Sequence, residues 1–257
     1  MWKKKLKRLT KCLDYTIIYI IFIFLNINKT FTKSITVSNK NELKEALDSG
    51  YSEIIINTSF DIDEQLINGI SKTFTIMGKT VDTSLNFLNE ENGFYFKLCK
   101  NIEIKNLKII GNLVLENCTG IELSNIEFNG VIKSKFSSIL FNNTTYHNLQ
   151  NYKSPYGIYL DKSNFDIYDS KLYGSASITN FIIYSTNETP EEKDDYYRLS
   201  IKNTYMSGEY ESGIIKADYM CNVTIEHSEF VNGFTKSHGF VLIFIFITIV
   251  IFYLNSQ

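Results

Sequence analysis

The most constraining feature of this sequence is a short segment that recurs along the chain. Ile102–Gly111 reads Ile-Glu-Ile-Lys-Asn-Leu-Lys-Ile-Ile-Gly, and Ile121–Gly130 repeats its pattern position by position. A third copy, Ile139–Asn148, follows at nearly the same interval. Repetition at about 20 residues with strand-forming content is typical of solenoids, in which each repeat packs only against its neighbours.

Each copy begins with two apolar residues separated by one position, which is strand periodicity with both side chains facing one core. An Asn, Asp or His follows, and its side chain can bond nearby backbone and tolerates the left-handed conformation that a sharp corner needs. Stacked copies would put these residues in one column, with neighbours about 4.8 Å apart. We interpret the column as a structural ladder rather than a binding site. The predicted ladder comprises Asn106, Asn125, Asn143, Asp169, Asn203 and His227.

The repeats predict an all-β fold, a single-stranded parallel β-helix, over residues 35–235. The composition agrees, because Ile, Phe and Tyr are abundant and there are only 2 Pro. Later copies are spaced more widely, as the steps from Asn143 to Asp169 and from Asp169 to Asn203 show. Extra residues in a solenoid enter loops on a particular side. We expect the longest loop at Ser185–Tyr196, which is acidic and polar, and a second near Asn148–Tyr156.

A short helix is expected at the start of the repeats. Asn41–Ser49 places Leu43, Ala46 and Leu47 on one face, after Ser38 or Asn39 as the N-cap and before Gly50 as the stop. This helix would cover the open end of the solenoid, where uncovered N–H and C=O groups invite end-to-end association.

Both ends of the chain are apolar and differ from the repeats. Residues 1–33 place six basic residues before the apolar run Thr16–Leu25, which predicts a signal peptide or an uncleaved signal anchor. Phe240–Leu254 is an uninterrupted apolar run, and we expect a transmembrane helix over 239–254. A lipid-anchor attachment signal and a buried terminal strand are the alternatives. These segments predict a membrane-anchored protein with its β-helix on the extracellular or lumenal side.

The charge distribution excludes one class of partner. The net charge is -2 at pH 7, and without residues 1–14 the chain has 20 basic and 27 acidic residues, a net charge near -7. Nucleic-acid binding needs a clustered basic face, which this distribution does not offer.

Cysteine and asparagine positions indicate two kinds of covalent chemistry. Cys99 and Cys118 are separated by the same offset as Ile102 and Ile121, so they should stack on adjacent rungs, at a separation that a disulfide accepts. A stack of buried thiols is the alternative. No cluster in the sequence has metal-site spacing, so we expect no metal or cofactor. Candidate N-glycosylation sites are Asn187, Asn57 and Asn222, of which Asn187 on the long loop is the best placed.

One segment also carries a family resemblance. Asn101–Gly111, Asn-Ile-Glu-Ile-Lys-Asn-Leu-Lys-Ile-Ile-Gly, resembles the pectate lyase family, where an Asn-Val-Ile-Ile-Arg-Asn-Leu-like segment is typical. The resemblance covers residues 35–130, and beyond them the chain is similar only to pectin-lyase-like β-helices in general. It implies a right-handed parallel β-helix, and it is specific for the fold rather than for the activity.

The family's catalytic pattern is not matched. The resemblance implies Ca²⁺ held by Asp side chains and an Arg acting as base on an acidic sugar, but Ser124 stands where the family has an Asp. The family's Arg-x-Pro-x-x-Arg segment is absent, and the only Arg residues are Arg8 and Arg198. The related polygalacturonases use clustered Asp residues and a Gly-His-Gly, whereas the Asp194-Asp195 pair here lacks the flanking pattern. We therefore expect that lyase and hydrolase chemistry is absent.

Three functional hypotheses remain. The first is a non-catalytic, surface-displayed β-helix that binds a polysaccharide, a cell-wall component or another cell-surface partner, and it is motivated by tyrosines that gather in residues 152–173. The second is a degenerate lyase or hydrolase acting on acidic polysaccharide. The third is a β-helix ectodomain truncated from a larger product. Catalytic candidates under the second hypothesis are Arg198, Asp194, Asp195, Lys216 and Asp218.

Overall fold

The computed structural model of this 257-residue protein describes residues 33–68, 73–148, 155–175, 181–186, 197–218, 221–234, 242–245 and 249–252. The fold lies within one compact unit, Ser34–Gln257. The predicted signal or anchor segment falls outside the described residues, apart from Lys33.

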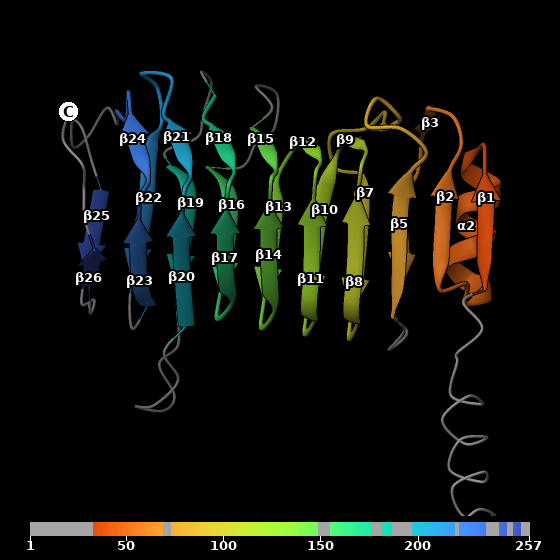
Figure 1. Ribbon diagram of the computed structural model, residues 1–257, viewed down its shortest axis with the longest axis horizontal. Coiled ribbons are helices and arrows are strands. Elements are labelled where there is room, and N and C mark those ends of the chain that lie inside the picture. The colour runs from red at the N-terminus through yellow and green to blue at the C-terminus, as the bar shows by residue number, and fades with distance from the viewer. Residues whose placement is uncertain are drawn as a thin grey trace, which may run out of the picture. The chain divides into compact units, whose positions relative to one another are not determined.

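The described strands form three sheets, A, B and C, and the chain passes through them in that order in each rung (Figure 1). Sheet A contains β1 (Ser34–Val37), β2 (Glu53–Ile56), β5 (Phe74–Gly78), β8 (Lys100–Lys105), β11 (Thr119–Ser124), β14 (Ser138–Asn142), β17 (Asn164–Tyr168), β20 (Tyr197–Lys202), β23 (Cys221–Glu226) and β26 (Ile249–Phe252). Sheet B contains β3 (Phe60–Ile62), β6 (Ser84–Phe87), β9 (Lys108–Ile110), β12 (Glu127–Asn129), β15 (Thr145–His147), β18 (Lys171–Tyr173), β21 (Tyr205–Ser207) and β24 (Glu229–Val231). Sheet C contains β4 (Leu66–Asn68), β7 (Gly93–Lys97), β10 (Asn112–Glu116), β13 (Ile132–Lys135), β16 (Tyr156–Asp161), β19 (Phe181–Thr186), β22 (Gly213–Asp218) and β25 (Leu242–Ile245).

The strand register reproduces the sequence repeat. Ile121 lies opposite Ile102 on one side and Ile139 on the other, so the offsets between the first three copies are the parallel register of sheet A. The register continues across the longer spacings, with Ile139 opposite Phe165 and Phe165 opposite Leu199. The predicted single-stranded parallel β-helix is confirmed.

The inward-facing side chains of the three sheets form one apolar core. In β8, Ile102 and Ile104 are fully buried, whereas Glu103 between them is only half-buried. Aromatic rings fill part of this core, where Phe94 and Phe96 stack with ring centroids 5.5 Å apart. Since every second strand residue faces inward, the residues between them form the outer faces of the sheets.

The corner from sheet A to sheet B is built from the residues of the expected ladder. All six have a left-handed backbone, with φ between 47° and 53°. Asn143 Nδ2 donates to Asn125 Oδ1 at 2.7 Å, and Asn203 Nδ2 donates to Asp169 Oδ1 at 3.0 Å. From β8 onward this corner is two residues long in every described rung, such as Asn125 and Ile126 between β11 and β12.

The corner from sheet C to sheet A also has a left-handed residue, but without a common side chain. Its φ values of 49° to 58° belong to Leu98, Asn117, Phe136 and Lys162. The residue that follows each is a buried Cys or Ser whose sulfur or hydroxyl donates to the carbonyl two residues back. Ser163 Oγ donates to Asp161 O at 3.0 Å, accepts from Ser137 N at 3.1 Å and accepts from Ser134 Oγ at 3.0 Å. These side chains therefore satisfy the buried backbone of the corner.

Glycine forms part of the corner from sheet B to sheet C. Gly111 and Gly130 have φ of 153° and 159° and lie on adjacent rungs. A Cβ at Gly130 would come within 1.8 Å of the Gly111 carbonyl oxygen. Only glycine fits there, because the backbones of adjacent rungs approach too closely for a side chain.

The helix α2 (Lys40–Ser49) packs at the start of the sheets, beside β1 and β2 in Figure 1. The Asn39 side chain accepts hydrogen bonds from Asn41 N and Glu42 N, and Gly50 ends the helix with φ of 75°. Leu43, Ala46 and Leu47 are buried in the core, as their spacing indicates.

The C-terminal apolar run differs from the expected helix. Its described residues form β25 and β26, which pair with β22 and β23 and continue sheets C and A. The helical interpretation of 239–254 is therefore wrong at the residues of these two strands, and Phe240 and Leu254 lie outside the described residues. Within the described part of the chain, no helix is long and apolar enough to cross a membrane.

Candidate functional site

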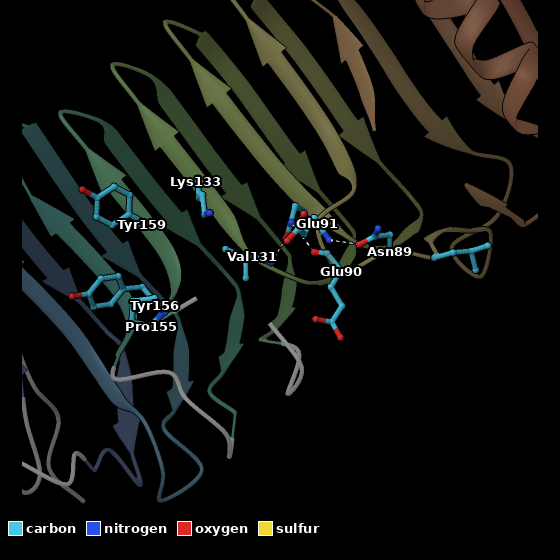
Figure 2. A pocket seen from close by; sticks show the side chains of 10 residues that line it. Asn89, Glu90, Glu91, Val131, Lys133, Pro155, Tyr156 and Tyr159 are labelled. Carbon is cyan, nitrogen blue, oxygen red and sulfur yellow. Dashed lines mark hydrogen bonds between the residues drawn. The ribbon is translucent and has the colours of Figure 1, made fainter. Parts of the chain in front are cut away.

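A groove of about 890 Å³ lies against the outer face of sheet C, and we call it the sheet C groove. Its volume falls in the range of small-ligand clefts. Figure 2 shows Tyr156 and Tyr159 on one side, Glu90 and Glu91 on the other and Lys133 between them. The lining residues are Leu88, Asn89, Glu90, Glu91, Asn112, Val131, Lys133, Pro155, Tyr156 and Tyr159.

Strand register assembles the tyrosine side of this groove. Along sheet C, each outward-facing residue lies opposite the corresponding residue of the next rung. One such row runs through Tyr95, Val114, Lys133, Tyr159, Tyr184 and Lys216. Because neighbouring strands are about 4.8 Å apart, the tyrosine and lysine side chains of this row follow one another at about that spacing.

Three tyrosines of sheet C form a compact aromatic cluster. The ring centroids of Tyr156 and Tyr184 lie 4.4 Å apart, those of Tyr159 and Tyr184 5.7 Å, and those of Tyr156 and Tyr159 6.0 Å. Lys216 Nζ lies 4.5 Å from the centroid of the Tyr184 ring, a cation–π contact. Burial raises the pKa of Tyr184, and the side chains of Thr186 and Asp218 lie close enough to the phenol to affect that pKa.

The acidic side of the groove is a loop fixed to sheet C by hydrogen bonds. Asn112 Nδ2 donates to Glu90 O at 2.9 Å, and Asn112 Oδ1 accepts from Val131 N at 3.3 Å. Asn89 Oδ1 accepts from Glu91 N at 3.0 Å within the loop itself. One amide side chain therefore ties the loop backbone to the start of the next rung, while Glu90 and Glu91 are exposed.

The groove offers stacking faces and charged hydrogen-bonding groups rather than an activated nucleophile. Its described lining residues include two carboxylates and one ammonium group, but no Ser, Cys or His. Aromatic rings provide rigid apolar area, and the phenol, amide and charged groups around them can bond the hydroxyls of a ligand.

Arg198, a sequence candidate for catalysis, lies on the outer face of sheet A. Its Nε donates to Asp166 Oδ1 at 2.9 Å and its Nη2 donates to Asp166 Oδ2, so the guanidinium is held by a bidentate ion pair. That hydrogen-bonded carboxylate raises the pKa of Arg198. A second hollow of about 660 Å³ contains this pair together with Glu103 and Glu122.

Of the other catalytic candidates, the two that the structure describes lie on a different sheet from Arg198. Lys216 and Asp218 lie on β22 in sheet C, joined by an ion pair of 3.0 Å. Asp194 and Asp195 lie outside the described residues. Ser124, at the position where the family resemblance implies an Asp, is buried in β11. Among the residues that the structure describes, no group of three His, Cys, Asp or Glu side chains could hold a metal ion.

Cys99 and Cys118 stack on adjacent rungs as buried thiols, with no disulfide between them. Cys99 Sγ donates to Lys97 O at 3.4 Å, and Cys118 Sγ donates to Glu116 O at 3.4 Å and Phe96 O at 3.3 Å. The hydrogen bond to Cys118, together with burial, raises the pKa of Cys99 far above its ordinary value. The thiol alternative is therefore the one that the structure contains.

Two glycosylation candidates fall among the described residues. Asn57 follows β2, where its Nδ2 donates to Ser38 Oγ at 3.3 Å and its Oδ1 accepts from Lys79 Nζ at 2.8 Å. Asn222 lies in β23, opposite Arg198. Asn187 lies outside the described residues.

Sequence reasoning alone does not assemble the aromatic cluster. The tyrosines of residues 152–173 form a group in the sequence, but Tyr168 lies on sheet A and Tyr173 on sheet B. Tyr184 joins Tyr156 and Tyr159 only through the register between β16 and β19. This register crosses an insertion between the two strands, so it becomes visible only once they are paired.

Comparisons with known proteins give a likeness of fold only. No protein-family profile matches the chain, and no curated protein matches its sequence. Among solved structures, an alginate lyase from Paenibacillus sp. str. FPU-7 is similar, with a TM-score of 0.39 and 11% sequence identity. The match covers 78% of this chain and 98% of that one. A likeness at this TM-score carries no information on activity.

Proposed function

We propose that this protein binds carbohydrate chains in the sheet C groove. The single observation that carries the proposal is the cluster of Tyr156, Tyr159 and Tyr184, which presents aromatic rings on an outer sheet face beside a groove of about 890 Å³. Tyrosine suits this role because its ring packs against the C–H face of a sugar while its hydroxyl bonds a neighbouring sugar hydroxyl.

The charged groups suit a ligand rich in hydroxyls. Lys133 lies next to Tyr159 in the strand register, and Glu90 and Glu91 lie across the groove. Sugar hydroxyls can accept from the ammonium group and donate to the carboxylates, so both sides can contact one chain. The loop that carries the carboxylates is already fixed through Asn112, which reduces the conformational entropy lost on binding.

A non-catalytic role is the preferred form of this proposal. Arg198 is engaged by Asp166 on sheet A, away from the aromatic cluster on sheet C. The alternative is a lyase or hydrolase that acts on acidic polysaccharide in the same groove, where Lys133 could neutralise a sugar carboxylate and Glu90 or Glu91 could move a proton.

The experiment is a glycan-binding screen of the full chain, followed by titration calorimetry with the best ligand. Tyr159→Ala should weaken binding about 5- to 30-fold, because a central aromatic contact contributes roughly 1–2 kcal/mol. Tyr159→Phe, which keeps the ring, should lose less. Tyr205→Ala removes an aromatic side chain of sheet B and should bind like the unmodified protein.

Equal binding by Tyr159→Ala and Tyr205→Ala would refute the proposal, and so would the absence of any bound glycan. Product formation should be followed in parallel, with polygalacturonate and alginate as substrates. Unsaturated or newly reducing ends that disappear in Lys133→Met would replace the binding function by the enzymatic alternative.

We also propose that the β-helix functions outside the cytoplasm, through export or anchoring by residues 1–33. Six basic residues followed by the apolar run Thr16–Leu25 support this placement, together with the sequons at Asn57 and Asn222. Cell fractionation with protease protection tests it. Recovery of the chain in the cytoplasmic fraction, without a shift on glycosidase treatment, would contradict it.

A further inference from the structure

Three polar residues form a buried column at the ends of adjacent strands of sheet C. Asp161 ends β16, Thr186 ends β19 and Asp218 ends β22. Asp161 lies opposite Thr186, and Ser185 lies opposite Ala217, which brings Thr186 beside Asp218. The exposed fractions of the three residues are 8%, 2% and 5%.

The side chains of this column point to the outer face of sheet C. Asp161 has the same strand parity as Tyr159, Thr186 the same as Tyr184, and Asp218 the same as Lys216. They are nevertheless more deeply buried than those neighbours. The column is therefore a shielded polar row on the outer face of sheet C rather than part of the apolar core.

Three oxygen atoms of this column have no partner at hydrogen-bond geometry among the described residues, although the Tyr184 phenol lies near enough to Thr186 and Asp218 for both to affect its pKa. The three atoms are Asp161 Oδ1, Thr186 Oγ1 and Asp218 Oδ1, and each is almost completely shielded from solvent. Buried polar atoms are nearly always paired, because leaving them without a partner is costly. Three such atoms on three adjacent strands indicate a common ligand.

The second oxygen of each carboxylate is already engaged. Lys135 Nζ lies 3.4 Å from Asp161 Oδ2, and Lys216 Nζ lies 3.0 Å from Asp218 Oδ2. Each ammonium group thus occupies one oxygen of its carboxylate, and the unpaired oxygens are left for another group. The Lys135 side chain is 56% exposed, so solvent screens its charge.

We infer that Asp161, Thr186 and Asp218 bind a hard, oxygen-coordinated cation, of which Ca²⁺ is the best match. Ca²⁺ prefers oxygen ligands, carboxylates above all, at about 2.3–2.6 Å and accepts irregular geometry. Neighbouring strands are about 4.8 Å apart, so an ion near the Thr186 hydroxyl can be reached by a carboxylate from each side. Water completes the coordination. Mg²⁺ fits less well, because it demands a compact octahedron with shorter distances.

The expected affinity is low. Only two carboxylates coordinate the ion, and two lysines lie on their far oxygens, so the dissociation constant should fall in the range of about 10⁻⁴ to 10⁻³ M. Such an affinity suits an environment rich in calcium. The ion would join three rungs whose sequence spacings differ, since β16, β19 and β22 are separated by insertions of unequal length. This inference does not rest on the proposed carbohydrate function.

The test is a calcium titration of the full chain with two readouts. At a Ca²⁺ concentration about tenfold above the dissociation constant, Tm should rise by about 3–6 °C. Tb³⁺, which replaces Ca²⁺ at oxygen sites, should show emission sensitised by Tyr184, two positions before Thr186 on the same strand face. Mg²⁺ at the same ionic strength should give a smaller shift in Tm.

Two substitutions test whether the calcium response arises at the column of Asp161, Thr186 and Asp218. Asp218→Asn and Thr186→Val should each remove the Tm shift and the sensitised emission. Glu122→Gln is the control, because it neutralises a half-buried carboxylate on sheet A and should respond like the unmodified protein. A shift that persists in both column variants would overturn the inference. If those variants do not fold, the unmodified chain still decides, because the absence of a calcium-selective rise in Tm at millimolar Ca²⁺ would also overturn it.

Discussion

Removing one corner hydroxyl should destabilise the β-helix well beyond what its size suggests. Ser163 is 1% exposed and its Oγ links the carbonyl of Asp161 to the backbone N–H of Ser137. In Ser163→Ala the Asp161 carbonyl keeps its hydrogen bond from Phe136 N at 3.0 Å, whereas Ser137 N loses the hydroxyl that accepts its hydrogen bond. Ser134 Oγ also loses its acceptor, at 3.0 Å, but a hydroxyl can rotate toward another group, so the loss falls mainly on the fixed N–H of Ser137.

The magnitude follows from that donor. A buried N–H without a partner costs about 1–3 kcal/mol. For a domain of this size, about 2 kcal/mol corresponds to a fall in Tm of roughly 4–8 °C. Urea unfolding should show a lower midpoint with an unchanged m-value, because the surface exposed on unfolding is the same.

The control for this prediction is Ser138→Ala. Ser138 Oγ also accepts a backbone hydrogen bond, from Gly120 N at 2.8 Å, but Ser138 is half-buried and this bond is exposed to solvent. Water can replace the lost acceptor there, so the cost should stay within about 0.5 kcal/mol. If the two variants lose equal stability, burial is not what gives the corner hydroxyl its effect, and the reasoning is refuted.

Three further predictions concern the corners and sheet B. Asn143→Ala should cost about 1–2 kcal/mol in urea unfolding, since it loses the bond to Asn125 and keeps a left-handed φ of 49°, whereas Asn143→Gly should cost less. Cys118→Ser should change stability by less than about 1 kcal/mol, because serine occupies the equivalent position in later rungs, and a larger loss would contradict this equivalence. Burial lowers the pKa of half-buried His147 below its unfolded value, so protonation favours the unfolded chain. Stability should therefore fall as the pH drops below about 6.5, and His147→Gln should flatten that part of the pH profile measured by urea unfolding.

The repeat is readable from the sequence because it is set by local chemistry. Asn106 and Asn125 mark a corner that needs a left-handed backbone, and the alternation around Ile102 and Ile121 marks the strand that precedes it. Both signals are carried by the residues themselves. The same holds for α2, whose cap and buried face follow from spacing alone.

The second left-handed corner is not predictable in this way. Leu98, Phe136 and Lys162 adopt a backbone that their side chains do not favour. The rungs on either side impose it, through hydrogen bonds such as Phe136 N to Asp161 O at 3.0 Å. Tertiary pairing overrides local preference at these positions.

Two other differences between sequence and structure have separate causes. The strands β3, β4 and β6 are not evident in the sequence, because three or four residues are too few to show a period. The run from Leu242 to Phe252 resembles a helix in sequence because its continuous apolarity hides any alternation. The aromatic cluster depends on register across insertions, which becomes visible only once the strands are paired.

From β8 onward, the corner between sheets A and B keeps its two-residue length, whereas the loops beside sheet C differ in length from rung to rung. In these rungs, insertions occur at the corners that lead into and out of sheet C, while Asn143-Thr144 and its equivalents keep a constant length. The alignment of the tyrosine row depends on this constant strand register, but the loop with Glu90 and Glu91 does not. A lineage could therefore replace the loops around the groove, and with them its ligand preference, while inheriting the same aromatic surface.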